Sequence, residues 1–128
     1  MSDLSPSTET AQIPEIEIPA SSNTVNVRVI DTTTRLYMPV GTMFDPLIKG
    51  HTTLASPSFS FLIEHEHLGR KILFDMGVQK AWEDQAPSTV EMIKEYEWDV
   101  QVEKDVAQIL GEHGIPLVAI NAIIWRLA

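Results

Sequence analysis

The sequence contains no cysteine, which excludes disulfide bonds and metal sites built from thiolates. It has no run near the roughly 18 apolar residues that a membrane-spanning helix needs, and no basic segment followed by an apolar one at its N-terminus. The Gly-x-Ser-x-Gly turn of many hydrolases and the glycine-rich loop that binds phosphates are both missing. We therefore expect a soluble, cytoplasmic protein without a membrane partner.

Basic residues are scarce as well. The chain has 9 Lys and Arg against 18 Asp and Glu, which gives a net charge of −9. Because proteins bind nucleic acids largely by releasing counterions with Lys and Arg, we expect no nucleic-acid partner. Four acidic residues lie within the first twenty positions, which contain no base: Asp3, Glu9, Glu15 and Glu17.

The length of 128 residues and the hydrophobic content of 44% fit one ordinary globular domain. Residues 1–22 combine three prolines with Ser, Thr and acids, a composition that buries too little apolar surface to offset the entropy of ordering. We expect a disordered leader at 1–22 and a domain at 23–128. The alternative for the leader is a short extended segment on the domain surface, with Ile13, Ile16 and Ile18 as its apolar residues.

The first part of the domain carries strand signals. Val25, Val27 and Val29 alternate with other residues at period two, which predicts a half-buried strand. Residues 32–51 contain two prolines and two glycines, and we expect a long loop there.

The segment "SFSFLIEHEHLGRKILFD" predicts a β-hairpin at residues 58–75, because two apolar strands flank a polar turn. Helix-forming residues follow and are interrupted by Pro87. We expect one short helix at 79–85 and another at 88–96.

The segment "QVEKDVAQILGEHG" places apolar residues on one helical face: Val102, Val106, Ile109 and Leu110. Gly114 supplies the left-handed position that ends such a helix. The apolar run Leu117 to Trp125 then predicts a buried strand that is covered on both faces.

Histidines are the first candidates for a metal site in a chain without cysteine. His65 and His67 flank Glu66, and side chains two apart on a strand point the same way, so half of a metal site is allowed there. Because the triplet lies at the expected hairpin tip, we favour a polar turn. His51 and His113 are more simply explained as solvated or structural residues, His113 as a cation at the end of a helix.

The remaining polar and aromatic candidates have simple explanations. Asp75 follows a strand, and the turn it would cap is a commoner role than a general base. Trp82, Trp98 and Trp125 are expected in or beside the core. No residue stands out as a catalytic group.

Three segments resemble the metallo-β-lactamase superfamily, in its branch of lactonases and their fungal relatives. They are "RLYMPVGTMFDP" at 35–46, "SFSFLIEHEHLGRKILFDMGV" at 58–78, and "VAQILGEHGIPLVAINAIIW" at 106–125. The resemblance implies an α+β fold, a four-layer αβ/βα sandwich of which residues 23–128 form an incomplete domain with the first β-sheet and one or two helices.

In that superfamily, the strand similar to residues 120–125 leads directly into a His-x-His-x-Asp-His motif that helps to hold zinc or another divalent metal. Here the sequence continues as Arg126, Leu127 and Ala128. The resemblance therefore implies that no metal ligand and no catalytic residue of the family can be assigned, and that this chain binds no metal cofactor.

Three interpretations follow from the resemblance and the residues. The first is a truncated family member that is inactive alone. The second is half of an enzyme that pairs with a separate metal-binding chain and contributes substrate contacts: Tyr37, Met38, Met43 and Phe44. The third is a non-enzymatic domain that adds the strand at 117–125 to a partner's sheet. Because half a sandwich leaves its inner face wet, we also expect self-association or pairing through the exposed sheet.

Overall fold

The computed structural model of the protein describes residues 16–125. The elements follow in chain order: β1 (Asn26–Pro39), β2 (Thr53–His65), β3 (Arg70–Phe74), α1 (Pro87–Glu95), β4 (Asp99–Gln101), α2 (Val106–Glu112) and β5 (Ala122–Ile124). Within these residues the strands form one curled sheet in the order β4-β1-β2-β3-β5. β5 runs parallel to β3, and all other neighbours are antiparallel.

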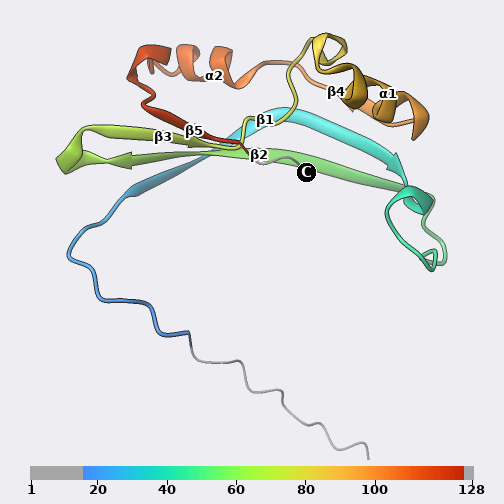
Figure 1. Cartoon of the computed structure of the whole chain (residues 1–128), viewed down its shortest axis with the longest axis horizontal. Coiled ribbons are helices and arrows are strands. Elements are labelled where there is room, and N and C mark those ends of the chain that lie inside the picture. The colour runs from blue at the N-terminus through green and yellow to red at the C-terminus, as the bar shows by residue number, and fades with distance from the viewer. Residues whose placement is uncertain (1–15, 126–128) are drawn as a thin grey trace, which may run out of the picture.

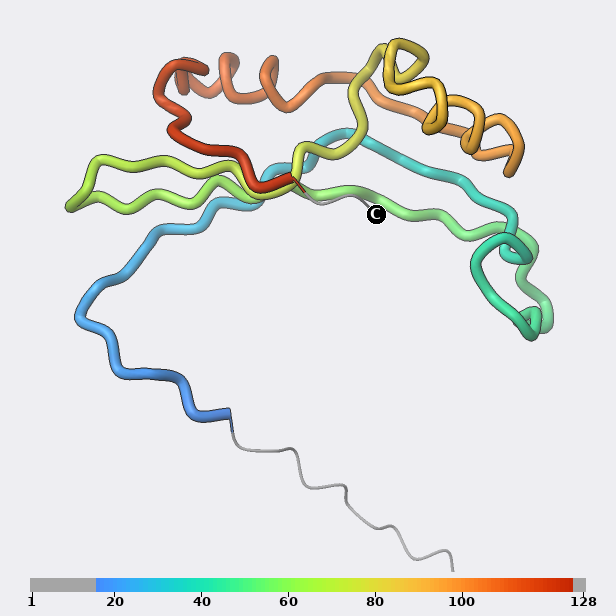
Figure 2. Tube along the Cα trace, viewed as in Figure 1, coloured from blue at the N-terminus to red at the C-terminus, as the bar shows by residue number. Residues whose placement is uncertain are grey.

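Both helices lie on the same side of the sheet, and the described part of the N-terminal segment passes on the opposite side (Figures 1 and 2). We call the side without helices the open face. Register places these apolar side chains on it: Val27, Val29, Phe59, Phe61, Ile63, Ile72, Phe74 and Ile124. The architecture is α+β with one covered and one uncovered sheet face, which confirms the expected partial sandwich.

The core lies between α2 and the covered face. Its buried members come from three strands and one helix: Ile30, Leu62, Leu73, Val106 and Leu110. The predicted helical face is correct, since Val106 and Leu110 are one turn apart and both are buried. Gly114 adopts a φ of 72°, and the backbone N–H of Ile115 bonds to the carbonyl of Leu110 at 2.9 Å, which closes the helix as expected.

The strand expected from Val25 is confirmed, but its valines are not half-buried by the core. Val27 and Val29 are 55% and 64% exposed, because their side chains point to the open face. The alternate positions Ile30, Thr32 and Thr34 are the buried ones.

The long loop expected at residues 32–51 is wrong over its first part. β1 continues to Pro39 through an irregularity between Asp31 and Arg35, where four steps of β1 face only two steps of β2. Threonine suits strands because it is branched at Cβ, and the Thr32 hydroxyl donates to the Ser58 carbonyl at 2.8 Å. Of the expected loop, only the part that follows β1 lies outside a strand. It opens with a 3₁₀ turn at Val40–Thr42.

The hairpin at 58–75 is confirmed, with a first strand that begins earlier than expected. Its tip is a 3₁₀ turn at Glu66–Leu68 closed by Gly69 at a φ of 57°. The helix expected at 88–96 is confirmed as α1, with Pro87 at its first turn. The helix expected at 79–85 is wrong, since only a 3₁₀ turn forms at Trp82–Asp84.

The final apolar run does form a strand, but a short one without cover on both faces. β5 has three residues, and Ile123 and Ile124 are 52% and 48% exposed. An edge strand has one neighbour, and the open face offers no second layer within residues 16–125. The expected leader lies mainly outside the described residues, and its described part, from Ile16 to Ser22, is exposed and forms neither helix nor strand.

No helix in the described range 16–125 is long and apolar enough to cross a membrane.

Candidate functional site

Several hydrogen bonds hold the turn after β3. The Oδ1 atom of Asp75 accepts from the backbone N–H groups of Met76 at 2.7 Å and Gly77 at 3.1 Å. The Ser60 hydroxyl donates to the carbonyl of Phe74 at 3.1 Å and to that of Asp75. Asp75 therefore shapes the turn, which is the role that the sequence favoured.

Gly77 fits this turn for two reasons. Its φ of 63° is a left-handed conformation, and a Cβ placed there would lie 2.8 Å from the Thr32 Oγ1 atom. Thr34 adds a contact from the same strand, since its Oγ1 lies 3.4 Å from the Val78 nitrogen. The buried hydroxyls of β1 and β2 thus hold the strand-end turn against the sheet.

The proposed substrate contacts do not all share one surface. Tyr37 lies in register with Ala55, on the same side of the sheet as the open face, and is 37% exposed. Met38 points to the other side and is 4% exposed. Met43 and Phe44 follow the turn after β1 and are 49% and 42% exposed. Tyr37, Met43 and Phe44 are accessible to a ligand, whereas Met38 can act only through the side chains packed on it.

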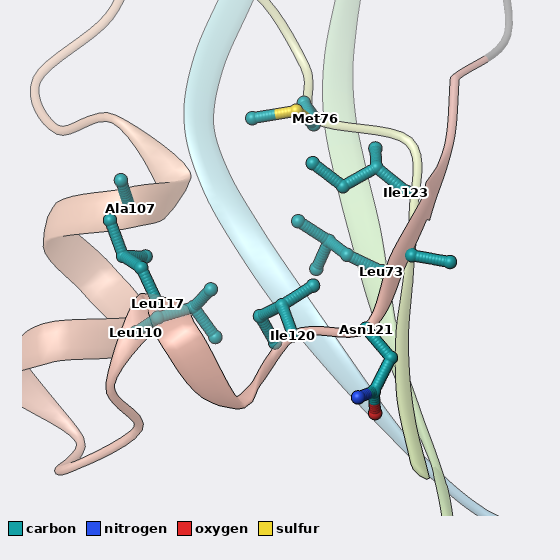
Figure 3. Close-up of a pocket in the computed structure, with 9 residues that line it drawn as sticks. Leu73, Met76, Ala107, Leu110, Leu117, Ile120, Asn121 and Ile123 are labelled. Atoms are coloured by element: carbon teal, nitrogen blue, oxygen red, sulfur yellow. The ribbon is translucent and has the colours of Figure 1, made fainter.

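An apolar cavity of about 430 Å³ opens between α2, β3 and β5 (Figure 3). Side chains that line it include Leu73, Met76, Leu110, Ile120 and Ile123. Asn121 is polar, but its Oδ1 accepts from the backbone N–H of Lys71 at 2.7 Å. The cavity contains no charged side chain, so it can receive apolar groups but offers no acid, base or nucleophile.

A charged cluster lies on the covered side near the hairpin tip. Glu64 is 8% exposed, and its carboxylate accepts a hydrogen bond from the Lys71 Nζ. The Nε of Arg28 lies 3.0 Å from its other oxygen, an ion-pair distance without hydrogen-bond geometry. The bond from Lys71, then the charge of Arg28, hold the pKa of Glu64 below its usual value of 4.5, although burial acts in the opposite direction.

A second ion pair lies on the open side of β1. Both Asp31 oxygens accept from the Arg35 guanidinium, at 3.0 and 2.8 Å. This hydrogen bonding, together with the backbone N–H of Thr33, lowers the pKa of Asp31. Both side chains stay substantially exposed, so water screens the pair.

The histidines lie apart from these features. His65 Nδ1 accepts from the Leu68 N–H at 3.3 Å, and Glu66 accepts from the Asn26 amide at 2.6 Å, so the triplet at 65–67 serves the hairpin tip. His113 Nδ1 lies 2.8 Å from the Ile109 carbonyl at the end of α2. His51 is exposed in the segment between β1 and β2.

The three tryptophans differ in exposure. Trp82 and Trp98 are partly buried, as expected, and Trp98 Nε1 is buried without a hydrogen-bond partner among residues 16–125. Trp125 is 66% exposed, so the expectation of a core position is wrong for it.

Several fungal proteins are similar to this chain in sequence. The chain is 40% identical over 117 residues to a protein of Fusarium pseudograminearum named gamma-lactamase FDB1, which covers 88% of this chain and 28% of that protein. It is 39% identical over 116 residues to the metallo-hydrolase mfmC of Annulohypoxylon moriforme, with 88% of this chain and 30% of that protein covered. The names gamma-lactamase and metallo-hydrolase support the resemblance of this chain to the fungal lactonase-like branch of the metallo-β-lactamase superfamily.

The chain spans less than a third of the length of those curated relatives. A similar segment occurs in a protein of Penicillium roqueforti named cytochrome P450 monooxygenase mpaDE, with 38% identity over 120 residues and 14% of that protein covered. A comparison with protein-family models finds no match.

The superfamily implies a divalent metal, and the described residues do not fit one. From residue 16 to residue 125, no three His, Asp or Glu side chains come together in a way that could hold an ion. The rings of His65 and His67 are 6.3 Å apart, and Glu66 between them is already bonded to Asn26. No hydrolytic step can be derived through a metal held by residues 16–125.

Sequence reasoning missed two features of the chain. The buried hydroxyls of Thr32, Thr34 and Ser60 were available as a signal, because the Thr-x-Thr spacing places two threonines on one face of a strand. The cavity beside α2 had no signal, since its lining residues are ordinary core types that come from separate elements.

Proposed function

We propose that residues 16–125 form the first-sheet part of a metal-dependent hydrolase that opens cyclic amides or esters, and that this chain alone is hydrolytically inactive. The metal ligands would come from polypeptide beyond these 128 residues. One observation carries the proposal: the sheet keeps an apolar open face, while the described residues assemble no metal-binding group. The substrate class follows the names of the relatives, a gamma-lactamase and a metallo-hydrolase.

In a complete hydrolase the metal, zinc or another divalent ion, would activate water for attack on the carbonyl. Residues of this chain would do other work. The turn at Asp75 and Gly77 would fix the end of β3 against the sheet. Tyr37, Met43 and Phe44 would contact the apolar part of the substrate, and Met38 would support β1 from the covered side.

Metal analysis and an activity assay on the purified 128-residue chain test the first claim. We expect far less than one equivalent of zinc, iron or manganese after dialysis, and no opening of a γ-lactam or γ-lactone above the buffer rate. A tightly held equivalent of metal together with hydrolysis that a chelator abolishes would refute inactivity.

Complementation tests the role as half of an enzyme. The part of the gamma-lactamase relative that this chain does not match would be expressed separately and mixed with the chain in the presence of zinc. We expect hydrolysis only in the mixture, with a raised KM for Phe44→Ala. Phe59→Ala, at a residue of similar exposure on the open face, serves as a comparison for general packing loss. If the mixture stays inactive with both components folded, the proposal fails.

A second candidate function is a binding module that uses the segment 117–125 as a docking strand. It is favoured by the position of β5 at the edge of the sheet, followed by the exposed Trp125. Hydrogen exchange separates the two candidates. A part of a hydrolase should exchange quickly at β5 alone and slowly once the remaining polypeptide is added, whereas a binding module should be indifferent to that addition.

A further inference from the structure

We propose that two copies of this chain associate through their open faces and form a symmetric face-to-face dimer. The occupant of the open face in the isolated chain is thus a second copy. This goes beyond the proposed function and does not depend on it, since it concerns the chain without any added polypeptide.

The size of the apolar patch is the first argument. Four side chains on the open face are about half exposed or more: Val27 at 55%, Val29 at 64%, Phe59 at 45% and Ile124 at 48%. With Phe61, Ile63, Ile72 and Phe74 partly exposed between them, the patch offers roughly 600 Å² per copy, if an aromatic side chain presents about 150–250 Å² when fully exposed. Two such patches approach the 1,200 Å² or so at which specific interfaces begin, whereas a monomer rarely exposes this much contiguous apolar surface.

Self-complementary charge is the second argument. In a face-to-face dimer, the two ends of a face that lie on either side of the two-fold axis each meet the opposite end of the partner's face. Arg70 is in register with His65, five residues to one side of Ser60 on β2. Asp99 is in register with Tyr37, and Tyr37 with Ala55, five residues to the other side of Ser60.

These pairings put a cation and an anion at opposite ends of the same face, on either side of its apolar centre. A second copy related by a two-fold axis that lies in the plane of the interface near Ser60, perpendicular to the line from Arg70 to Asp99, would set Arg70 of each chain beside Asp99 of the other. Asp31 and Arg35, the charged pair between those ends, already neutralise one another at 2.8 Å. The centre of the interface would therefore bury apolar groups without leaving a lone charge.

Overall charge opposes the association, because each copy carries −9. Local pairing and net charge can be separated by a charge swap. Arg70→Asp changes the net charge by −2 and Asp99→Arg by +2, so the double variant keeps −9.

Light scattering after size exclusion tests the dimer with the full 128-residue chain. We expect a species of twice the 14.3 kDa chain mass that dissociates on dilution. Val29→Glu should shift dissociation to at least tenfold higher concentration. Val118→Glu adds the same charge at a residue that is 93% exposed outside the open face, and it should leave the dimer unchanged.

The charge variants refine the test. Arg70→Asp should weaken the dimer, and the double variant with Asp99→Arg should recover at least half of the loss. A chain that stays monomeric at every concentration would overturn the proposal, as would equal effects of Val29→Glu and Val118→Glu, or no recovery in the double variant.

A cysteine cross-link guards against variants that fail to fold. The wild-type chain has no cysteine, so Phe59→Cys, near the proposed axis, introduces a single thiol. Mild oxidation should give a covalent dimer in high yield, and Val118→Cys should not. Equal yields from the two variants would mean random collision and would contradict the interface.

Discussion

The two faces of the sheet differ sharply in burial. The covered face packs Leu62 and Leu73, each 1% exposed, against α2. On the same strands, the residues next to them in sequence point the other way and form the open face. Alternation alone decides which of two similar apolar residues is buried, because successive side chains of a strand point to opposite sides.

Apolar character and burial are therefore separate properties of this chain. Val29 is as apolar as any core residue, yet it is 64% exposed. A sequence that keeps apolar residues on both faces of a strand is adapted to a sheet with two covers. Residues 16–125 supply one of these covers, the helical one.

The largest effect is expected from shortening a side chain on the covered face. Leu62→Ala should lower the free energy of unfolding by about 2–5 kcal/mol, because it removes buried methyl groups and leaves a cavity under α2. Val29→Ala, on the open face, should cost less than about 1 kcal/mol. Urea unfolding at a protein concentration too low for association would measure both. Equal losses would show that the two faces are equally covered in solution.

The next effect concerns the turn that crosses onto the covered face. Gly77→Ala should destabilise the chain by about 2 kcal/mol, since it forces a left-handed residue to carry a Cβ that meets Thr32. Gly50→Ala is the matched control, because its φ of 83° imposes the same kind of strain with no atom within 4 Å of the added Cβ. The difference between the two variants in a urea titration isolates the contact. If Gly50→Ala costs as much, backbone strain alone explains both.

Local patterns were sufficient for most elements. The hairpin at 58–75 could be predicted because two apolar strands flank a polar turn with Gly69, and α2 because its apolar residues recur on one face. Burial could not be predicted for Val27 and Val29. The alternation of apolar residues indicates that one face of the strand is apolar, but it does not indicate which element covers that face. The extension of β1 through Thr32 to Pro39 was not predicted. A loop was expected there because of the prolines and glycines, although threonine favours strands.

The site was less predictable than the fold. Asp75 follows a strand and precedes Gly77 in the sequence, and this local order was enough to favour a turn. The division between Tyr37 and Met38 was missed, although adjacent residues on a strand always point to opposite faces. It was missed because the segment was expected to be a loop, so no alternation was applied to it.

A smaller effect is expected from the buried ion pair on the covered side. Glu64→Gln should cost about 1–2 kcal/mol at neutral pH, because the Lys71 Nζ would donate to a neutral amide and not to a carboxylate. The pKa of Glu64 is lowered in the folded chain, so its contribution is complete above the ordinary value of 4.5 and is lost as the pH falls through the lower folded pKa. Unfolding measured from neutral pH to strongly acidic pH should show the gap between wild type and Glu64→Gln closing below about pH 4.5. A gap that persists under acid would assign the loss to packing.

The smallest effect should come from the same kind of pair on the open side. Arg35→Gln removes the partner of Asp31, but both side chains are exposed, at 39% and 50%, and water solvates the carboxylate that remains. The change in unfolding free energy should therefore be smaller than for Glu64→Gln and should shrink further in high salt, since exposed charges are screened.

Dimer formation would increase the effect of Arg35→Gln. If a second copy covers the open face, Asp31 loses its solvent at high protein concentration, and Arg35→Gln then weakens association much more than it weakens the fold. Comparing the variant's unfolding at low concentration with its dissociation at high concentration distinguishes a face that stays wet from one that is covered.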